Sequence, residues 1–246
     1  MNKYDVNDHT SYILGISLIV EALKEVPSVV KKVYLSSKAN KNKELDKLIE
    51  LCNKNSIEIE EDDLLISKLS LKENCYGIGI FEKYSLPLET IKHLVLYNFN
   101  NEGELGTIFR SAVSFDFKDV IIVNSDIDIY SPKVIRASMG SFFHLNIKKY
   151  SDIDEYFKEY NYPIYPFVSN GNRELSSIKF KEPYSLIIPQ NYHDLDNRFI
   201  ESYYIKHNGE EISLSSLSSI VLNYAYHQSV NDKNISYKAQ KWAFYF

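Results

Sequence analysis

The stretch Lys92–Asn124, KHLVLYNFNNEGELGTIFRSAVSFDFKDVIIVN, decides the fold class of this chain. Apolar runs typical of buried strands stand at its two ends, in residues 93–99 and 119–124. Between them, apolar residues recur at helical spacing: Leu105, Ile108, Phe109, Ala112 and Val113. A strand, a helix and a second strand in this order predict two parallel strands joined by a crossover helix.

The same alternation continues toward the C-terminus. Further strands are predicted at 146–150, 164–168 and 185–188, and a last helix at 214–228. Strands separated by helices predict a parallel sheet that is covered on both faces. We therefore expect residues 92–246 to form one α/β domain.

The residues before this domain predict a smaller α/β module. Helical spacing from Ile13 to Leu23 predicts an amphipathic helix. Short strands are expected at 32–36, 57–59 and 76–81, with further helices around 45–52 and 64–69. We expect this module to occupy residues 1–84, followed by a linker at 85–91.

Composition narrows the class of protein. The chain has 246 residues, of which 44% are hydrophobic and 25% charged, as is typical of a globular protein. The first ten residues are polar, and the longest apolar runs are far shorter than a membrane helix. Two cysteines in unrelated contexts favour a reducing compartment, so we expect a cytoplasmic protein without a membrane span. The six histidines lack metal-ligand spacing, so no metal site is predicted.

Charge leaves two interpretations open for the N-terminal lysines. The net charge of −5 argues against a protein that binds phosphate over its whole surface. Nevertheless, six lysines, including Lys31, Lys32 and Lys41, gather within residues 24–43. Such a cluster is either a solvated face or a local RNA contact.

The turn before the predicted helix at 105–113 is a candidate ligand site. Gly103 and Gly106 follow a strand, and the free N–H groups of a helix N-terminus attract anions. The segment lacks both the dinucleotide-binding glycine spacing and the lysine of a nucleoside-triphosphate loop. Arg110, one turn further on, is either a solvated charge or an oriented guanidinium group.

A second candidate segment is SPKVIRASMGSFFH, residues 131–144. Ser131 and Pro132 predict a helix start, and Gly140 predicts its end. The small residues Ala137 and Ser138 allow another backbone to approach. From the residues alone, this segment serves either close helix packing or chemistry.

Together these segments resemble the two leading motifs of the SpoU/TrmH-type RNA methyltransferases. The pattern GxxxRxAxxF at 106–115 is similar to the first motif, and residues 133–144 match the second almost continuously. The helix with Ile13-Leu-Gly-Ile and Val20-Glu-Ala-Leu resembles the start of the family's substrate-binding domain. The resemblance implies a trefoil-knotted catalytic domain, a homodimer and S-adenosylmethionine-dependent methylation of a ribose 2′-hydroxyl in transfer or ribosomal RNA, without a metal.

The resemblance also assigns roles to residues. Arg110 would orient the 2′-hydroxyl or help to deprotonate it, with Ser213 and Glu104 as further catalytic candidates. RNA contacts are assigned to Lys31, Lys32, Lys41 and Arg136. The cofactor candidates lie in the last two motifs and are Ile188, Pro189, Gln190, Asn191, Ile205, His207 and Leu214.

The cofactor motifs depart from the family pattern and leave alternatives open. Pro189 and Tyr192 stand where the family has glycines, and Lys206 where it has proline. Proline has no N–H to donate, and a tyrosine side chain hinders close approach of a ligand. The chain is therefore either a working methyltransferase with altered loops or a non-catalytic relative that binds RNA or ribosomes. An unrelated α/β protein is the third alternative.

Overall fold

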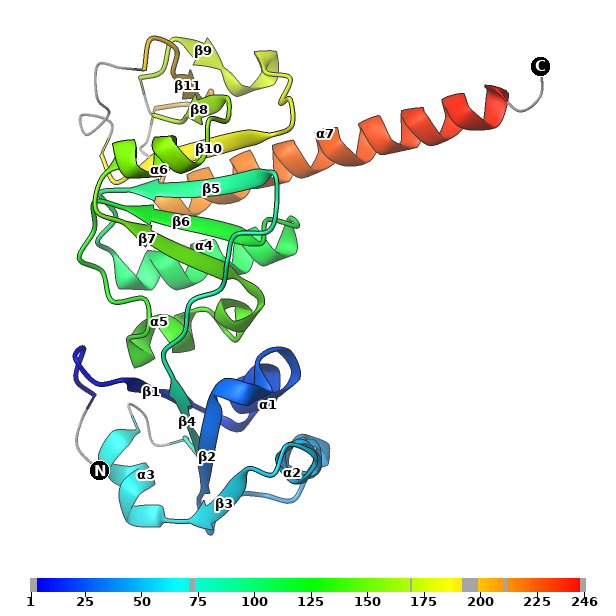
Figure 1. Cartoon of the computed structure of the whole chain (residues 1–246). Helices are drawn as coiled ribbons and strands as arrows, with labels where there is room; N and C mark the ends of the chain where they lie inside the picture. Colours follow the sequence, from blue (N-terminus) through cyan, green and yellow to red (C-terminus); the bar gives the residue numbers. More distant parts are fainter. Residues whose placement is uncertain (1–3, 71–73, 169, 192–198, 210–211, 244–246) are drawn as a thin grey trace. The chain divides into compact units, whose positions relative to one another are not determined.

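The computed structural model describes residues 4–70, 74–168, 170–191, 199–209 and 212–243, with side chains up to residue 230. The chain divides into two compact units (Figure 1). Unit 1 comprises residues 1–86, 101–110 and 127–145. Unit 2 comprises residues 87–100, 111–126 and 146–246. The chain thus passes between the units several times, and one helix, α4 (Glu102–Ser114), contains residues of both.

Unit 1 contains a four-stranded sheet with the strand order β1-β4-β2-β3. Its strands are β1 (Thr10–Leu14), β2 (Val30–Leu35), β3 (Glu58–Glu61) and β4 (Gly77–Glu82). Helices α1 (Ile16–Glu25) and α2 (Lys43–Lys54) lie on one face, and α3 (Asp63–Leu69) lies on the other (Figure 1). On the α3 face, Tyr12, Leu14, Ile78 and Ile80 of the sheet pack against Leu65, Ile66 and Leu69.

The prediction of one continuous helix from Ile13 was wrong. Ile13 belongs to β1, and α1 begins only at Ile16. Gly15 separates the two elements with φ at 121°, a conformation that glycine adopts without steric cost. The apolar run from Tyr12 to Leu14 is buried in the sheet, so its spacing matched a helix only by coincidence.

The segment 127–145 completes unit 1. It contains α5 (Pro132–Ala137) and the 3₁₀ turn η2 (Ser141–His144). Ser131 caps α5 by accepting a hydrogen bond from the Lys133 N–H, as predicted. Phe81 of β4 packs edge-on against Phe143, with 5.7 Å between ring centroids. Aromatic packing therefore holds this segment against the four-stranded sheet.

Unit 2 is built on a parallel sheet with the strand order β7-β6-β5-β10-β8. The strands are β5 (Lys92–Tyr97), β6 (Asp119–Val123), β7 (Asn146–Tyr150), β8 (Ile164–Pro166) and β10 (Tyr184–Pro189). All five occur where apolar runs predicted them, and the parallel α/β class is confirmed. The central strands are buried because both faces of the sheet are covered.

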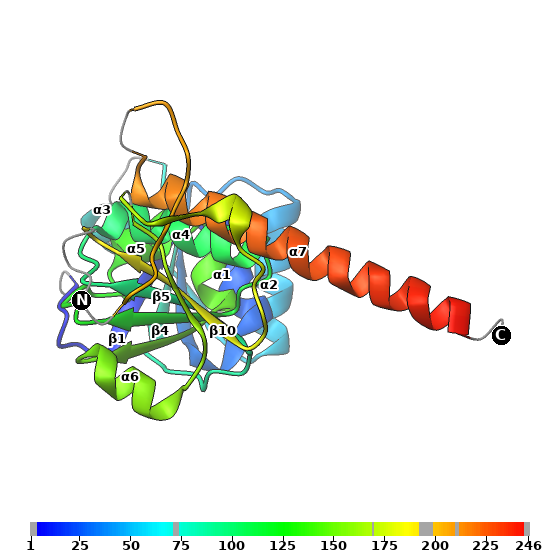
Figure 2. The same cartoon turned by 90° about the horizontal axis from the view of Figure 1, so that it is seen from above.

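Helices α6 (Ile153–Glu159) and α7 (Leu214–Ala243) lie on opposite faces of this sheet (Figure 2). On the α6 face, Tyr156 packs against Val95, Ile121 and Ile187. The last helix is longer than predicted, since it continues to Ala243. A short pair of strands, β9 (Arg173–Glu174) and β11 (Tyr203–Tyr204), was not predicted. None of the described helices is long and apolar enough to cross a membrane.

A buried polar chain connects the strands beneath the α6 face. His93, which is 0% exposed, lies at the start of β5, and its Nδ1 is 2.8 Å from the Tyr156 hydroxyl. The hydroxyls of Tyr156 and Ser185 are 2.6 Å apart. His93 Nε2 lies 3.8 Å from a carboxylate oxygen of Asp119. Burial lowers the pKa of His93, and the negative charge of Asp119 opposes this shift only in part.

We predict that acidification destabilises unit 2 through His93. In the unfolded chain this histidine takes up a proton near pH 6.5, whereas its lowered pKa keeps it neutral in the fold. Its contribution to stability is therefore complete above pH 6.5 and declines below that pH, by at most about 1.4 kcal/mol per pH unit. Urea unfolding of wild type and His93→Gln between pH 5 and 8 measures this. A steeper acid decline is expected in wild type, and equal slopes would contradict the prediction.

Candidate functional site

The start of α4 is fixed by its own residues. The Asn101 side-chain oxygen accepts hydrogen bonds from the backbone N–H groups of Gly103 and Glu104, at 3.1 and 3.2 Å. The Asn101 amide in turn donates to the Glu104 carboxylate, at 3.2 Å. Glu104, predicted as a catalytic candidate, thus takes part in capping the helix. The first-turn N–H groups of Gly103 and Glu104 are therefore already bonded within the protein.

Gly106 is where α4 and α5 meet. A Cβ atom at this position would lie 2.4 Å from Ala137 Cβ and 2.7 Å from the Ser138 nitrogen. Only glycine fits such an approach, because the nearest atoms belong largely to backbone. The glycine of the first motif therefore packs against the small residues of the second motif. The close-packing interpretation of residues 131–144 is correct for Ala137 and Ser138.

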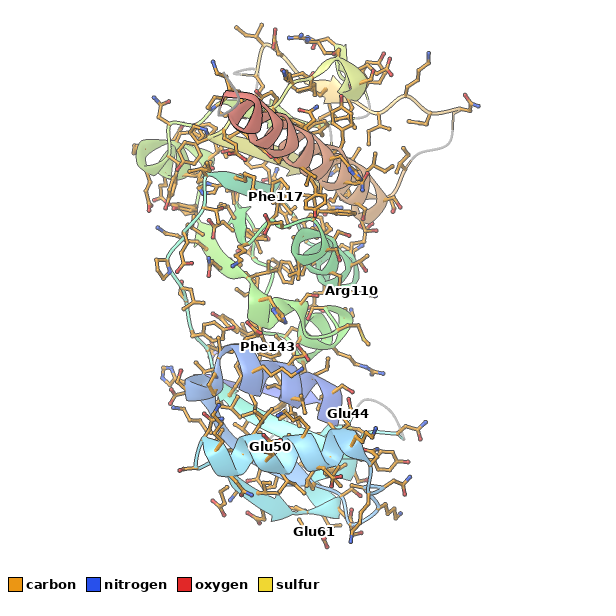
Figure 3. All side chains as sticks on the ribbon, turned by 90° about the vertical axis from the view of Figure 1, so that its right-hand side faces the viewer. Glu44, Glu50, Glu61, Arg110, Phe117 and Phe143 are labelled. Carbon is orange, nitrogen blue, oxygen red and sulfur yellow. The ribbon has the colours of Figure 1, made fainter. Side chains whose placement is uncertain are left out.

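Arg110 is exposed on α4 (Figure 3), whereas Leu105, Ile108 and Phe109 are completely buried. One residue further on, the Ser111 hydroxyl lies 2.7 Å from the hydroxyl of Ser219 on α7. The contacts of Gly106 and Ser111 hold the helix on both sides of Arg110. Arg110 thus lies on the exposed side of a helix that is packed on both sides of it.

The carboxyl ends of β5, β6 and β10 form one edge of the sheet, the usual place for ligands in parallel α/β folds. Asn98 and Asn124 follow β5 and β6 with left-handed φ values of 54° and 51°. The Asn124 side-chain amide donates to the Asn98 side-chain oxygen. This asparagine pair was missed from the sequence, although each residue directly follows an apolar strand.

Pro189 lies at the end of β10 with its nitrogen turned away from the central strand β5. The Gln190 N–H donates to the Tyr97 carbonyl of β5, at 2.8 Å, so the nitrogen of Pro189 faces the opposite neighbour, β8. β8 pairs with β10 only as far as Ile187. The Gln190 side chain also accepts a hydrogen bond from the Asn100 N–H, at 3.2 Å. Pro189 is therefore compatible with the strand.

The segment 199–209 runs beside residues 167–174. Tyr203 accepts a hydrogen bond from the Val168 N–H, at 2.8 Å, and β11 pairs in parallel with β9. Gly171 lies against this segment so closely that a Cβ atom would be 2.5 Å from the carbonyl carbon of Tyr203. This contact was also missed from the sequence, because the glycine and its neighbour are far apart along the chain.

The other predicted cofactor residues differ in their exposure. Ile188 and Pro189 are buried, Gln190, Ile205 and Leu214 are half-buried, and Asn191 and His207 are exposed. Ser213 is the N-cap of α7 and accepts a hydrogen bond from the Ser216 N–H, at 3.2 Å. All these residues belong to unit 2, whereas Arg110 and Glu104 belong to unit 1. Tyr192 lies outside the described residues.

Two residues in the segment after β11 have backbone groups that are placed to bind a ligand. Lys206 and His207 are exposed, and in the part of the chain that the structure describes their backbone groups form no hydrogen bond. Such groups are available to bind a ligand at the end of β11. Among those same residues, no group of three or more His, Cys, Asp or Glu side chains is placed to hold a metal ion.

The N-terminal lysines predicted to bind RNA are largely paired. Lys31 lies 2.9 Å from Glu82, and Lys32 lies 3.1 and 2.6 Å from Glu58 and Glu60. Unit 1 also carries exposed glutamates on α2 and β3, among them Glu44, Glu50 and Glu61 (Figure 3). Lys41 is exposed and Arg136 is half-buried. RNA contact by these four residues stays a prediction.

Comparison with family models gives two matches, one in each part of the chain. Residues 92–202 match the model of the SpoU rRNA methylase family. Residues 12–63 match the model described as RNA 2′-O ribose methyltransferase substrate binding. The order of the two matches is the order that the sequence motifs predicted.

Curated relatives and solved structures agree with these matches. The human protein named rRNA methyltransferase 3, mitochondrial, is 31% identical over 147 residues, which are 54% of this chain and 33% of that protein. A Xenopus tropicalis protein of the same name is 36% identical over 87 residues, 31% of this chain and 21% of that protein. The chain thus spans a third or less of the length of these relatives.

Two solved structures share the fold at low sequence identity. The SpoU methyltransferase AviRb from Streptomyces viridochromogenes, in complex with the cofactor AdoMet, superposes with a TM-score of 0.77 at 16% identity. The match covers 90% of this chain and 91% of that one. An AdoMet-bound rRNA methyltransferase from Sinorhizobium meliloti gives 0.73 at 19% identity, over 89% of this chain and 87% of that one.

Proposed function

We propose that this chain is an RNA methyltransferase of the SpoU type that methylates a ribose 2′-hydroxyl of ribosomal or transfer RNA. The observation that carries the proposal is the pair of family matches, one to the methylase domain and one to the substrate-binding domain. S-adenosylmethionine, when bound, supplies a methyl group on a positively charged sulfur. The 2′-oxygen would form a bond to this methyl group as the sulfur–methyl bond breaks and S-adenosylhomocysteine leaves, and the hydroxyl proton would pass to water.

Arg110 is the proposed catalytic residue. Alignment of the hydroxyl and help in losing its proton are the main needs of this reaction. A guanidinium group is almost always charged, so its role is to orient the hydroxyl and stabilise the developing negative charge on oxygen. The exposure of Arg110 on a helix held at Gly106 and Ser111 supports this role.

The residues at the carboxyl edge of unit 2 are the proposed cofactor site. The residues that would hold the cofactor, mostly through backbone groups, are Ile188, Pro189, Gln190, Asn191, Ile205, His207 and Leu214. The place of Pro189 in β10 supports this assignment, since the hydrogen bond from the next residue, Gln190, to β5 is present. The trefoil knot that the family resemblance implies belongs to the same proposal, as does a cytoplasmic location. The curated relatives named above are mitochondrial.

Methyl transfer to RNA tests the proposed function directly. Purified protein, tritiated S-adenosylmethionine and total RNA are incubated, and the labelled RNA is digested to nucleosides. Label in 2′-O-methylated nucleosides is expected, because the ribose is the proposed acceptor. Label confined to bases, or no label with any RNA fraction, would contradict the proposal.

We also propose that unit 2 forms a homodimer, as the resemblance to the family implies. The α7 helix carries both buried apolar residues and Ile220, which is 41% exposed. Light scattering at micromolar protein should give the mass of two chains. A mass of one chain, 28.6 kDa, would contradict the dimer.

A further inference from the structure

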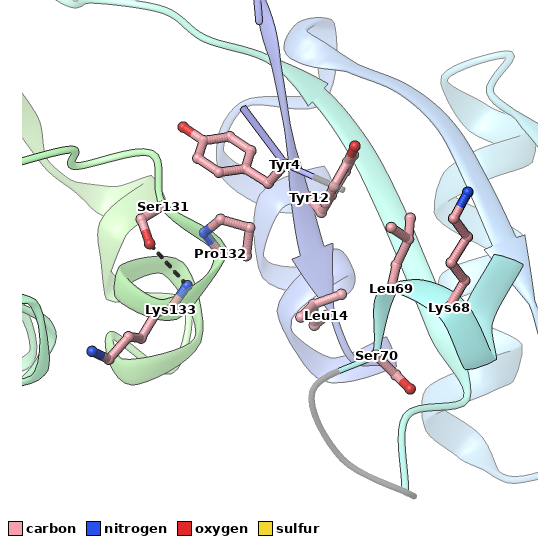
Figure 4. Close-up of a pocket in the computed structure, with 9 residues that line it drawn as sticks. All are labelled: Tyr4, Tyr12, Leu14, Lys68, Leu69, Ser70, Ser131, Pro132 and Lys133. Carbon is pink, nitrogen blue, oxygen red and sulfur yellow. Dashed lines mark hydrogen bonds between the residues drawn. The ribbon is translucent and has the colours of Figure 1, made fainter. Parts of the chain in front are cut away.

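A cavity of about 420 Å³ lies in unit 1, between the α3 side of the sheet and the start of α5 (Figure 4). Its walls include Tyr4, Tyr12, Leu14, Lys68, Leu69 and Lys133. All the lining residues belong to unit 1, so the cavity is formed within a single compact body. Its volume falls within the range of small-ligand sites.

Two tyrosine rings form the aromatic side of this cavity. The rings of Tyr4 and Tyr12 pack edge to face, with centroids 6.1 Å apart and planes at 77°. The hydroxyl of Tyr4 donates to a carboxylate oxygen of Asp128, which fixes the orientation of the ring. Tyr12 is only 5% exposed and is held by the core beneath it. An ordered ring of this kind suits stacking of a planar group.

Lysines flank the aromatic side. Lys68 comes from α3 and Lys133 from α5, and both are exposed (Figure 4). Lys133 lies 3.4 Å from Glu102 in an ion pair whose lysine side chain is 68% exposed. Because an exposed ion pair contributes little to stability, Lys133 can give up its contact with Glu102 and bind a phosphate instead. Lys83 adds positive charge, with its ammonium group 4.8 Å from the Tyr4 ring centroid.

An aromatic surface flanked by lysines matches the chemistry of a nucleotide. Bases stack on aromatic rings, and the phosphates on either side attract ammonium groups. Stacking requires an unstacked base, so the ligand is unpaired rather than duplex RNA.

We propose that this cavity takes one unpaired nucleotide of the RNA substrate, its base against Tyr4 and its phosphates near Lys68 and Lys133. The inference rests on the proposed function, since it names part of the RNA that the enzyme recognises. It assigns RNA recognition to the α3 face of unit 1 and makes the second-motif helix α5 part of that surface.

Binding of a fluorescein-labelled octauridylate, measured by anisotropy without cofactor, tests this proposal. The double variant Lys68→Glu, Lys133→Glu should bind at least tenfold more weakly, with a shallower salt dependence, because two phosphate contacts are lost. Tyr4→Leu keeps an apolar side chain but removes the ring, and a loss of roughly tenfold is expected. Lys54→Glu on α2, on the other face of the sheet, is the matched control and should bind like wild type.

Crosslinking locates the contact independently of affinity. An octamer that contains 4-thiouridine should crosslink to Tyr4 or Tyr12 when irradiated. Equal affinity of wild type and the double variant, equal binding of duplex RNA, or crosslinks only outside the cavity would overturn the proposal. Because no cofactor is present, a protein that binds the oligomer here but transfers no methyl group would contradict the proposed function alone.

Discussion

Replacing Gly106 with alanine is expected to destabilise the protein by about 3 kcal/mol, as severe overpacking does. The new methyl group would lie 2.4 Å from Ala137 Cβ and 2.6 Å from the Ala137 carbonyl carbon. These atoms belong to the short, capped helix α5, whose backbone cannot shift without disturbing the packing around Phe142 and Phe143. The shift in the urea midpoint, followed by circular dichroism, measures the effect.

Gly103→Ala is the matched control for this prediction. Gly103 lies on the same helix and is exposed, and a Cβ atom there would have only the Asn101 side-chain oxygen nearby, at 3.5 Å. Alanine is favoured over glycine in a helix by about 0.5–1 kcal/mol, so this variant should be slightly more stable than wild type. Equal midpoints for Gly106→Ala and wild type would show that α4 and α5 do not meet as closely as described.

Replacing Arg110 with alanine is expected to lower kcat for RNA methylation by about 100-fold or more, the usual contribution of a positioned donor that stabilises developing negative charge on oxygen. Stability should change by less than about 0.5 kcal/mol, since the side chain is exposed. Binding of S-adenosylmethionine should also persist, because the proposed cofactor residues lie elsewhere. Single-turnover methylation at saturating cofactor measures the chemical step.

Two further variants test whether catalysis needs the planar donor group of Arg110 or only a positive charge. Arg110→Lys keeps the positive charge but loses the planar fork of donors, so its kcat should fall between wild type and Arg110→Ala. Lys158→Ala removes an exposed cation from the helix α6 of unit 2 and should methylate RNA like wild type. A fully active Arg110→Ala variant would remove Arg110 from the proposed mechanism.

Much of the fold could be predicted because buried strands and amphipathic helices leave strong local patterns. The apolar runs at β5, β6 and β10 indicated the parallel sheet correctly. The boundary between β1 and α1 was misplaced because Ile13 happens to continue the helical spacing of α1. The pair β9 and β11 has only two residues per strand, so no periodicity can reveal it.

The candidate site was predictable in part. The motifs indicated Arg110 and the end of β10 as candidates, and their roles stay predictions. The role of Gly106 depends on Ala137, which is distant along the chain, and required the structure. The close contact between Gly171 and Tyr203 also joins residues that are distant along the chain, so it too required the structure. In the sequence, Pro189 argued against a cofactor loop because proline has no N–H to donate. The sequence does not reveal which neighbouring strand the nitrogen of Pro189 faces. The hydrogen bond from Gln190 to Tyr97 answers that question.

The most direct test of the central claim is calorimetric titration of the protein with S-adenosylmethionine, with S-adenosylhomocysteine as the companion ligand. We predict saturable binding of one molecule per chain in the micromolar range, through the carboxyl edge of unit 2. Absence of binding at millimolar ligand would contradict the claim that this chain is a methyltransferase, and would leave its fold as a scaffold for RNA binding alone.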